Sequence, residues 1–241
     1  NENLSYWSTQ WDANQEKEMK APPLFEDDYR RKSQFQDHIE GKSWLDFGCG
    51  AGGILRLLSD QARSSIGLEI QPAPRNLLNE MGINCVEKLS QVDDNSIDII
   101  TLFHVFEHLP QPIQIIQELS QKLSPGGKII IEVPQANDIL ISLFDLNAFK
   151  DFTFWSEHLI LHTRESLTKF ITTTKNLNID AVQGYQRYPL SNHLHWLAKS
   201  LPGGHKKWSF LNNQILEEAY SKTLQSIDKT DTLIAYVSKD Q

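Results

Sequence analysis

The sequence predicts an α/β protein in which helices cover both faces of a mostly parallel sheet. Two observations predict this class. Short apolar runs alternate with helix-like stretches between residues 43 and 133, and the runs are apolar at successive positions, as expected of strands buried on both faces. A glycine-rich turn also joins the first run to the next helix-like stretch, which is typical of nucleotide-binding α/β folds.

Length and charge narrow the function classes. The chain has 241 residues, of which 39% are hydrophobic, enough for one large domain with a real core. Its net charge of −8 disfavours a nucleic-acid binder, and two cysteines are too few for a disulfide scaffold. No apolar run reaches the roughly 18 residues of a membrane span, and the start lacks a signal-peptide pattern. We therefore expect a soluble, cytoplasmic protein that binds neither nucleic acid nor membrane.

The first elements are expected in a simple order. A helix fits Leu24 to Ile39, after a polar stretch that contains Tyr6, Trp7 and Trp11. The strand-like runs that follow are Ser43–Phe47, Ser65–Ile70, Ile83–Val86, Ile97–Leu102 and Lys128–Val133. The helices between them are Gly53–Ala62, Ala73–Met81 and Pro112–Leu123, the last stopped by Pro125-Gly126-Gly127. We expect residues 1–40 to form a helical arm or lid, and residues 41–241 to form the main domain.

The C-terminal part has weaker patterns. Thr163–Thr173 predicts a helix with Thr163 as its N-cap, and Ile179–Tyr185 and Thr232–Val237 predict strands. Two segments, residues 135–162 and 188–230, match no strand. Long connections at the carboxyl edge of a sheet often carry function. We therefore expect these segments to be helical insertions over the active site that build the substrate pocket.

The strongest motif is the glycine loop from Leu45 to Gly53. Gly48, Gly50 and Gly53 satisfy the dinucleotide pattern G-x-G-x-x-G. However, Asp46 lies two residues before the first glycine, where its carboxylate would repel a pyrophosphate. The same carboxylate would attract a cationic ligand without a phosphate, such as S-adenosylmethionine. The loop therefore favours S-adenosylmethionine over NAD and over a mere tight turn.

A second acid indicates a ribose. Glu69 ends the second strand-like run, 21 residues after Gly48. An acid about 20 residues beyond the glycines accepts hydrogen bonds from ribose hydroxyls. Glu69 supports an adenosine ligand but does not choose between the two cofactors.

Through these residues, the chain resembles the class I S-adenosylmethionine-dependent methyltransferases. The motif Asp46-x-Gly48-x-Gly50-x-Gly52 is similar to the first motif of that family, and Glu69 to its ribose acid. The similarity continues through residues 98–109 and through the L-x-P-G-G stretch at residues 123–127. The resemblance implies a Rossmann-like, seven-stranded sheet whose last strand, Thr232–Val237, is antiparallel. It also implies S-adenosyl-L-methionine as the cofactor.

The resemblance implies a set of cofactor contacts on the carboxyl side of the sheet. They are Asp46, Gly48, Cys49, Gly50, Gly52, Glu69, Leu89, Phe103 and His104. One departure concerns the adenine, because residues 87–90 do not match the acid that many relatives carry after the third strand. A backbone amide near Leu89 is expected to replace it.

A general base is expected on the acceptor side. Methyl transfer to oxygen or carbon needs a proton acceptor, and histidine titrates in the useful range. His158, preceded by Glu157, lies in the first insertion. Sugar-modifying members of the family are similar in placing a Glu-His pair near this point. We expect His158 to be the base, oriented by Glu157 or a neighbour; the alternative is a structural histidine.

Residues 104–108 match the zinc-protease pattern H-x-x-E-H. That pattern needs both histidines on one continuous helix, whereas here a strand precedes His104 and Pro110 follows His108. We therefore expect no metal site. We expect His104 to flank the cofactor with Phe103, and His108 to bond locally.

The sequence predicts a methyltransferase that acts on a small molecule. By resemblance, the acceptor is a sugar, a nucleotide-sugar or a surface-polysaccharide precursor. A quinone-like or phenolic O-acceptor is the alternative, as is a non-catalytic module that only binds the cofactor. The oligomeric state stays open.

Overall fold

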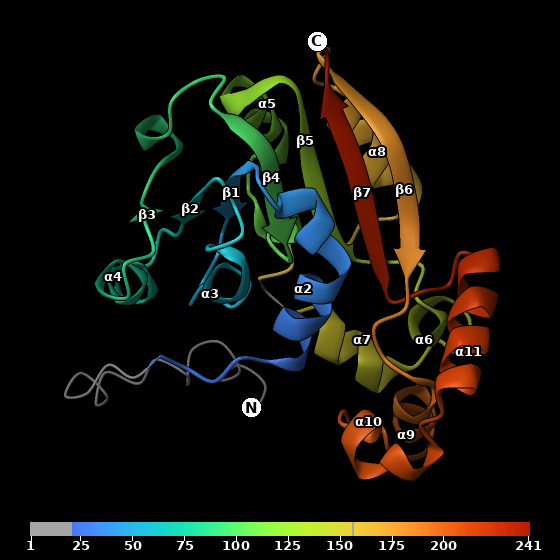
Figure 1. Cartoon of the computed structure of the whole chain (residues 1–241). Coiled ribbons are helices and arrows are strands. Elements are labelled where there is room, and N and C mark those ends of the chain that lie inside the picture. The colour runs from blue at the N-terminus through green and yellow to red at the C-terminus, as the bar shows by residue number, and fades with distance from the viewer. Residues whose placement is uncertain (1–20, 156) are drawn as a thin grey trace. The chain divides into compact units, whose positions relative to one another are not determined.

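A seven-stranded sheet organises the chain (Figure 1). The computed structural model describes residues 21–155 and 157–241, so Tyr6, Trp7 and Trp11 lie outside the described residues. The strand order is β3-β2-β1-β4-β5-β7-β6, and β7 runs against the other six. The strands are β1 Ser43–Phe47, β2 Ser64–Leu68, β3 Cys85–Val86, β4 Ile97–Phe103, β5 Leu123–Pro134, β6 Leu177–Tyr185 and β7 Thr232–Lys239. The predicted fold class is confirmed.

Helices fill the connections between the strands. They are α2 Glu26–Ile39, α3 Leu55–Leu58, α4 Pro72–Glu80, α5 Pro112–Lys122, α6 Ile139–Ser142, α7 Asn147–Thr153, α8 Arg164–Thr172, α9 Leu190–Lys199, α10 Gly204–Lys207 and α11 Gln214–Ser226. The part of the chain that the structure describes also has the short 3₁₀ turns η3 Leu89–Gln91, η4 Phe106–His108 and η5 Ser209–Leu211. Over the described ranges, no helix is both long and apolar enough to cross a membrane.

The described chain divides into two compact units. The first contains the residues up to Phe103, together with Ile116–Ile130 and Ser238–Gln241. The second contains His104–Ile115 and Ile131–Val237. The glycine loop and Glu69 thus belong to the first unit, whereas His104 and both insertions belong to the second.

The first unit is built around β1. All five residues of β1 are buried, and the strand pairs in parallel with β2 and β4, which places Leu45 beside Ile66 and Ile100. Consecutive buried positions are the pattern of a central strand covered on both faces. This arrangement brings the carboxyl ends of β1, β2 and β4 to one edge of the sheet.

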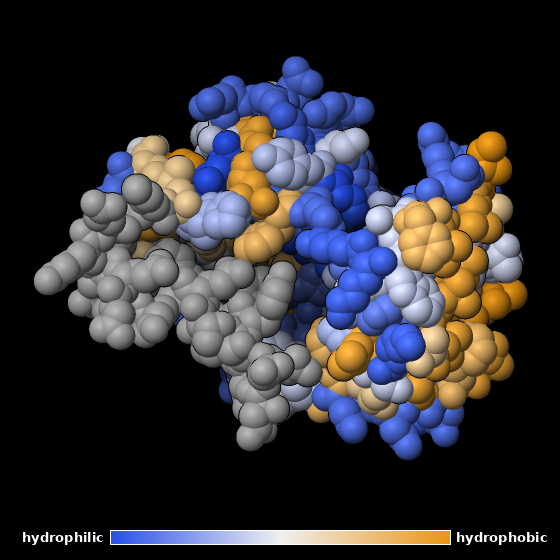
Figure 2. Space-filling model, turned by 90° about the horizontal axis from the view of Figure 1, so that it is seen from below, coloured by the Kyte–Doolittle hydropathy of each residue, from blue (hydrophilic) through white to orange (hydrophobic). Residues whose placement is uncertain are grey.

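Both predicted insertions fold into helices of the second unit. Ile139 and Leu140 from the first insertion pack with Trp196 and Leu224 from the second, and Phe149 covers this cluster. Apolar side chains also remain on the surface of the second unit (Figure 2). One of the exposed side chains is Phe210, at 80% exposure. The two segments that matched no strand therefore share a small core of their own.

Several element boundaries differ from the sequence prediction. β3 is only two residues long, and the side chain of Asn79 pairs with both backbone groups of Cys85, at 2.9 and 3.0 Å. α3 begins only at Leu55, since the glycine loop continues as turns through residue 54. Pro125-Gly126-Gly127 does not stop α5: α5 ends at Lys122, and β5 already begins at Leu123.

Candidate active site

The glycine loop follows β1 and leads into α3. Gly48, Gly50 and Gly52 all have positive φ, at +71°, +53° and +70°. Gly52 has a second reason to be glycine, because a Cβ there would lie 2.5 Å from Cδ2 of Leu78. Only glycine adopts this conformation without strain. The loop therefore brings bare backbone close to whatever binds at the end of β1.

Glu69 lies directly beside this loop. It follows the last residue of β2, and its Oε2 accepts a hydrogen bond from the backbone N–H of Gly50 at 2.9 Å. Its Oε1 accepts from the N–H of Gln71 at 2.7 Å. Both oxygens are held by backbone donors, so the carboxylate has a fixed orientation next to the loop. Each oxygen keeps a further lone pair for a ribose hydroxyl.

Asp46 is buried beneath the loop, at 3% exposure. Thr101 on β4 donates its hydroxyl hydrogen to Oδ1 of Asp46 at 2.6 Å, and the indole N–H of Trp44 donates to Thr101 at 2.9 Å. Burial raises the pKa of Asp46 to about 7, although the Thr101 hydrogen bond and the charge of Arg31 act in the opposite direction. A cationic ligand group would stabilise the ionised form of such a carboxyl.

The other residues expected at the cofactor follow strand ends of the same unit. Leu89, in η3 after β3, is 8% exposed, and Phe103, the last residue of β4, is 9% exposed. The guanidinium carbon of Arg31 lies 4.8 Å from the centroid of the Phe103 ring. Cys49 is a free thiol whose Sγ lies 3.7 Å from Sγ of Cys85. All but one of the predicted cofactor residues therefore belong to the first unit.

His104, the remaining one, begins the second unit. Its φ of +56° is unusual for a residue with a side chain, and such strain clusters at functional sites. Its Nε2 lies 2.8 Å from Nη1 of Arg187, and its Nδ1 lies 3.2 Å from Oε1 of Glu107. Nε2 also lies 3.3 Å from Oε1 of Glu132, so one guanidinium and two carboxylates surround this imidazole. Arg187 was not among the residues that sequence reasoning selected, since no local motif marks it.

The η4 turn and the first insertion bring three further groups together. The side chain of Glu107 is fully buried, and its backbone oxygen accepts from the N–H groups of Leu159 and Ile160, at 3.0 and 3.2 Å. The rings of His108 and His158 lie 4.9 Å apart between centroids. Burial would raise the pKa of Glu107, but its hydrogen bond with His104 and the nearby His104 and His108 hold it below the usual value.

Both of these histidines bind backbone carbonyls. Nδ1 of His158 lies 2.7 Å from the carbonyl oxygen of Thr153, and Nδ1 of His108 lies 2.6 Å from that of Glu157. The expectation that His108 bonds locally is therefore wrong, because its partner is 49 residues away. The chain path of the insertion, which no local pattern encodes, creates this contact. Burial lowers the pKa of His158, so the imidazole is neutral at pH 7.

A family model described as a methyltransferase domain matches residues 21–179. This range covers the glycine loop, Glu69, His104 and the first insertion. The chain belongs to this family. The family and the site together identify S-adenosylmethionine as the cofactor, since the glycine loop, the buried acid and the ribose acid provide backbone approach, negative charge and hydroxyl acceptors in one compact unit.

Curated relatives of this methyltransferase match about half of it. A "Ubiquinone biosynthesis O-methyltransferase" of Nitrosococcus oceani is 31% identical over 131 residues, which are 49% of this chain and 54% of that protein. The protein of the same name from Acinetobacter baylyi is 27% identical over 141 residues, 53% of this chain and 58% of that protein. The chain thus spans little more than half the length of these curated relatives.

Solved structures share the fold over most of the methyltransferase. A SAM-dependent methyltransferase from Archaeoglobus fulgidus superimposes with a TM-score of 0.61 at 18% identity, covering 87% of this chain and 92% of that one. Phosphoethanolamine N-methyltransferase 2 of Haemonchus contortus, solved with S-adenosyl-L-methionine, gives 0.57 at 15% identity, covering 90% of this chain and 52% of that one. At these identities the similarity establishes the fold.

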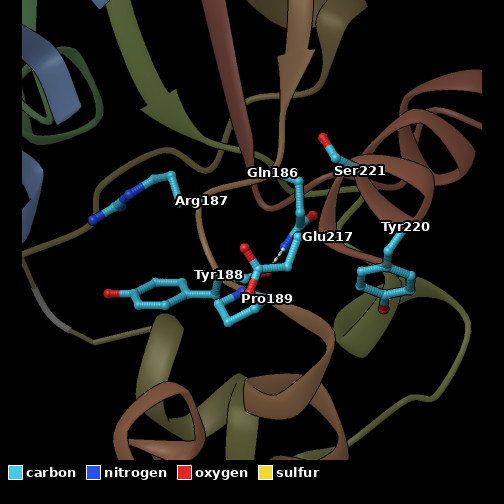
Figure 3. Close-up of a pocket in the computed structure, with 7 residues that line it drawn as sticks. All are labelled: Gln186, Arg187, Tyr188, Pro189, Glu217, Tyr220 and Ser221. Atoms are coloured by element: carbon cyan, nitrogen blue, oxygen red, sulfur yellow. Dashed lines mark hydrogen bonds between the residues drawn. The ribbon is translucent and has the colours of Figure 1, made fainter. Parts of the chain in front are cut away.

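A small pocket opens where β6 ends, within the second unit (Figure 3). Its lining residues are Gln186, Arg187, Tyr188, Pro189, Glu217, Tyr220 and Ser221. Asp231 holds the first part of this lining, because its carboxylate accepts from the N–H groups of Arg187 and Tyr188, at 3.0 and 3.1 Å. Burial raises the pKa of Asp231, although Arg187 opposes this rise. The lining therefore combines charged, amide and hydroxyl groups with tyrosine rings.

Proposed function

We propose that this methyltransferase transfers the methyl group of S-adenosylmethionine to a hydroxyl oxygen of a small sugar-type molecule. The acceptor class is a sugar, a nucleotide-linked sugar or a surface-polysaccharide precursor. The pocket at the end of β6 is the observation that carries the acceptor class. Glu217 and Ser221 offer an acceptor and a hydroxyl for ring hydroxyls, while Tyr188 and Tyr220 offer aromatic surface. A mostly polar lining with tyrosine rings suits a molecule that carries many hydroxyl groups.

The distribution of the predicted site residues over the two units supports this proposal. The first unit would hold the cofactor through Asp46, Glu69 and the glycine loop, with Leu89 near the adenine. Phe103 and His104 would flank the cofactor. Residues 41–241 would form the catalytic domain, preceded by an arm at residues 1–40. Residues 135–162 and 188–230 would supply the acceptor side.

His158 is the general base in this proposal. Its Nδ1 hydrogen is given to the carbonyl of Thr153, so Nε2 keeps a lone pair for the acceptor proton. Thr153 thus takes the orienting part that Glu157 or a neighbour was expected to play. The side chain of Glu157 is exposed, and we assign it a positioning part through its backbone oxygen, which binds His108.

The chain's contribution to the reaction is alignment and proton removal. S-adenosylmethionine supplies an electrophilic methyl group on a sulfonium. After the methyl group is transferred, the rest of the molecule is a neutral thioether. The acceptor oxygen forms a bond to the methyl carbon as the carbon–sulfur bond breaks, and its proton passes to Nε2 of His158. Holding the two reactants in line and excluding water accounts for most of such a rate enhancement.

A phenolic or quinone-like acceptor is the second candidate. The names of the two curated relatives favour it, since both act in ubiquinone biosynthesis as O-methyltransferases. Their coverage of about half the protein leaves open which acceptor the remaining residues select. A purely cofactor-binding module is the third outcome that the experiment separates.

The test combines binding with product analysis on the full chain. Calorimetric titration with S-adenosylmethionine, its demethylated product and NAD is expected to show binding of the first two alone. Incubation with nucleotide sugars, free sugars and catechols, followed by mass spectrometry, is expected to show a 14-dalton gain on a sugar. A gain on catechols alone would overturn the sugar assignment. Cofactor binding without any methylated product would favour the binding module.

The assignment of His158 has its own measurement. His158→Ala is expected to lower kcat at least tenfold, since general-base catalysis contributes about 10²–10⁴-fold, and added imidazole is expected to restore part of the rate. His38→Ala, an exposed residue on α2, is the matched control. Full turnover of His158→Ala would move the base elsewhere.

A further inference from the structure

We propose that Glu107, His108 and His158 form a binding site for a divalent transition-metal ion. One potential ligand atom from each residue lies within 4.8 Å of those from the other two. Two imidazoles and one carboxylate form a donor set typical of zinc and non-haem iron sites that keep open positions. From the sequence we expect no metal site, because the H-x-x-E-H stretch lacks the continuous helix that would present both of its histidines; the proposed site departs from that expectation. The present site uses only Glu107 and His108 from that stretch, and takes its third ligand from the insertion.

The two histidines have the tautomer that a metal requires. A carbonyl oxygen only accepts hydrogen bonds, so the Nδ1 atoms of His108 and His158 must carry hydrogen toward Glu157 and Thr153. Each Nε2 then has a free lone pair. Metal-binding histidines commonly donate their other ring hydrogen to a backbone carbonyl or a carboxylate, which fixes the ring orientation. The backbone therefore prepares both rings for coordination.

Glu107 supplies the charge, and it has an unexplained oxygen. The side chain is fully buried. Its Oε1 is 3.2 Å from Nδ1 of His104 and 3.8 Å from Nε2 of His108, whereas its Oε2 has no hydrogen-bond partner. A buried carboxylate oxygen without a partner is costly. A cation bound between Glu107 and the imidazoles would compensate this oxygen.

The fold holds the ligands together before any ion arrives. The backbone oxygen of Glu107 binds the N–H groups of Leu159 and Ile160, which directly follow His158 in the chain. The carbonyl of Glu157 binds His108. Ligand atoms around a zinc ion lie about 3.3 Å apart, given bond lengths of about 2.0–2.2 Å. A closure of about 1.5 Å at most would therefore complete the site.

The site deepens the proposed function, on which its chemical role rests. Three protein ligands leave at least one position for an acceptor hydroxyl, whose pKa a bound cation lowers. An acceptor with two adjacent hydroxyls, as in a vicinal diol or a catechol, would fit two open positions. The lone pair of His158 can serve either the metal or the acceptor proton. With the ion bound, His158 would hold the cation, the cation would lower the pKa of the acceptor hydroxyl, and the released proton would pass to water. Without the ion, His158 would take the proton as general base.

The test is metal binding by the full chain without cofactor or acceptor. After dialysis against a chelator, calorimetric titration with Zn²⁺ is expected to show one equivalent bound. His158→Gln and His108→Gln are each expected to weaken it at least tenfold. Co²⁺ is expected to give visible absorption bands that disappear in both variants. His38→Gln, on an exposed position of α2, is the control and is expected to bind like the wild type.

Each outcome decides the proposal. Equal Zn²⁺ affinity in the wild type and in both histidine variants, or no binding at all, would overturn it. Thermal melts of the variants identify any that fail to fold, and both histidines are half-buried rather than part of the core. Methyl transfer is measured separately, so metal binding without methylated product would leave this site standing and reject the proposed function. Methyl transfer without metal binding would do the reverse.

Discussion

The hydroxyl of Thr101 donates a hydrogen bond to the carboxyl of Asp46 across 2.6 Å, from one parallel strand to its neighbour. This contact gives Asp46 a fixed position beneath the glycine loop. It also tempers the effect of burial, which raises the pKa of Asp46 to about 7.

The affinity for S-adenosylmethionine is expected to depend on pH through Asp46. A ligand with a positive charge binds best to the ionised carboxyl, so below pH 7 each bound ligand must first displace a proton. Calorimetric titration is expected to show affinity rising between pH 6 and pH 8, by up to tenfold per unit below pH 7. Asp46→Asn is expected to bind more weakly and without this slope. A flat profile for the wild type would remove Asp46 from cofactor recognition.

Thr101→Val is expected to destabilise the first unit. The substitution keeps the shape but removes the hydroxyl, which leaves the buried Asp46 oxygen and the indole N–H of Trp44 without their partner. Unsatisfied buried groups cost about 1–3 kcal/mol, so urea unfolding is expected to show a loss of that size. Thr101→Ser, which keeps the hydroxyl, is the matched control. An equal loss in Thr101→Ser, which lacks the methyl group but keeps the hydroxyl, would show that the hydroxyl is not the source of the stability.

Glu69→Gln is expected to weaken cofactor binding at least tenfold. The carboxylate accepts from two backbone N–H groups, at Gly50 and Gln71, and an amide presents an oxygen to only one of them. The loop therefore loses a contact, and the ribose loses an acceptor. Glu80→Gln, on an exposed position of α4, removes the same charge away from the loop. Titration with S-adenosylmethionine compares the two, and similar affinities would place the ribose elsewhere.

Gly52→Ala is expected to destabilise the chain more than Gly126→Ala. Both glycines have positive φ, +70° and +73°, so alanine strains each by about 1–2 kcal/mol. At Gly52 the new Cβ would also lie 2.5 Å from Leu78, whereas nothing lies within 4 Å at Gly126. Chemical denaturation of the two variants measures the difference. Equal stabilities would mean that Leu78 moves aside without cost.

The sequence sufficed for the cofactor half because its signals are local. The strand β1, the glycines after it and Glu69 at the end of β2 are short patterns whose spacing implies one edge of a parallel sheet. Five strands and the Thr163 cap were also predicted nearly in place, since hydrophobic runs and capping side chains act over a few residues.

The second unit was less predictable, because its contacts join residues that are far apart in the sequence. His108 meets the carbonyl of Glu157 over 49 residues, and Arg187 meets His104 over 83. Neither pair leaves a local pattern. The short helices of the insertions depend on a shared cluster around Trp196, so their positions follow from packing rather than from periodicity.

The free thiols of Cys49 and Cys85 make the cofactor loop sensitive to oxidation. Their sulfur atoms are 3.7 Å apart, and a disulfide needs about 2.05 Å, so a small shift would cross-link the loop to β3. Two thiols would give up two electrons and two protons to dioxygen or a peroxide, and the disulfide would tie Cys49, and with it the glycine loop, to β3. Stored without reductant, the protein is expected to lose affinity for S-adenosylmethionine and to regain it with dithiothreitol. A Cys85→Ser variant is expected to keep its affinity for S-adenosylmethionine during storage without reductant. A loss of affinity in the stored wild type alone would therefore report on the geometry of the loop.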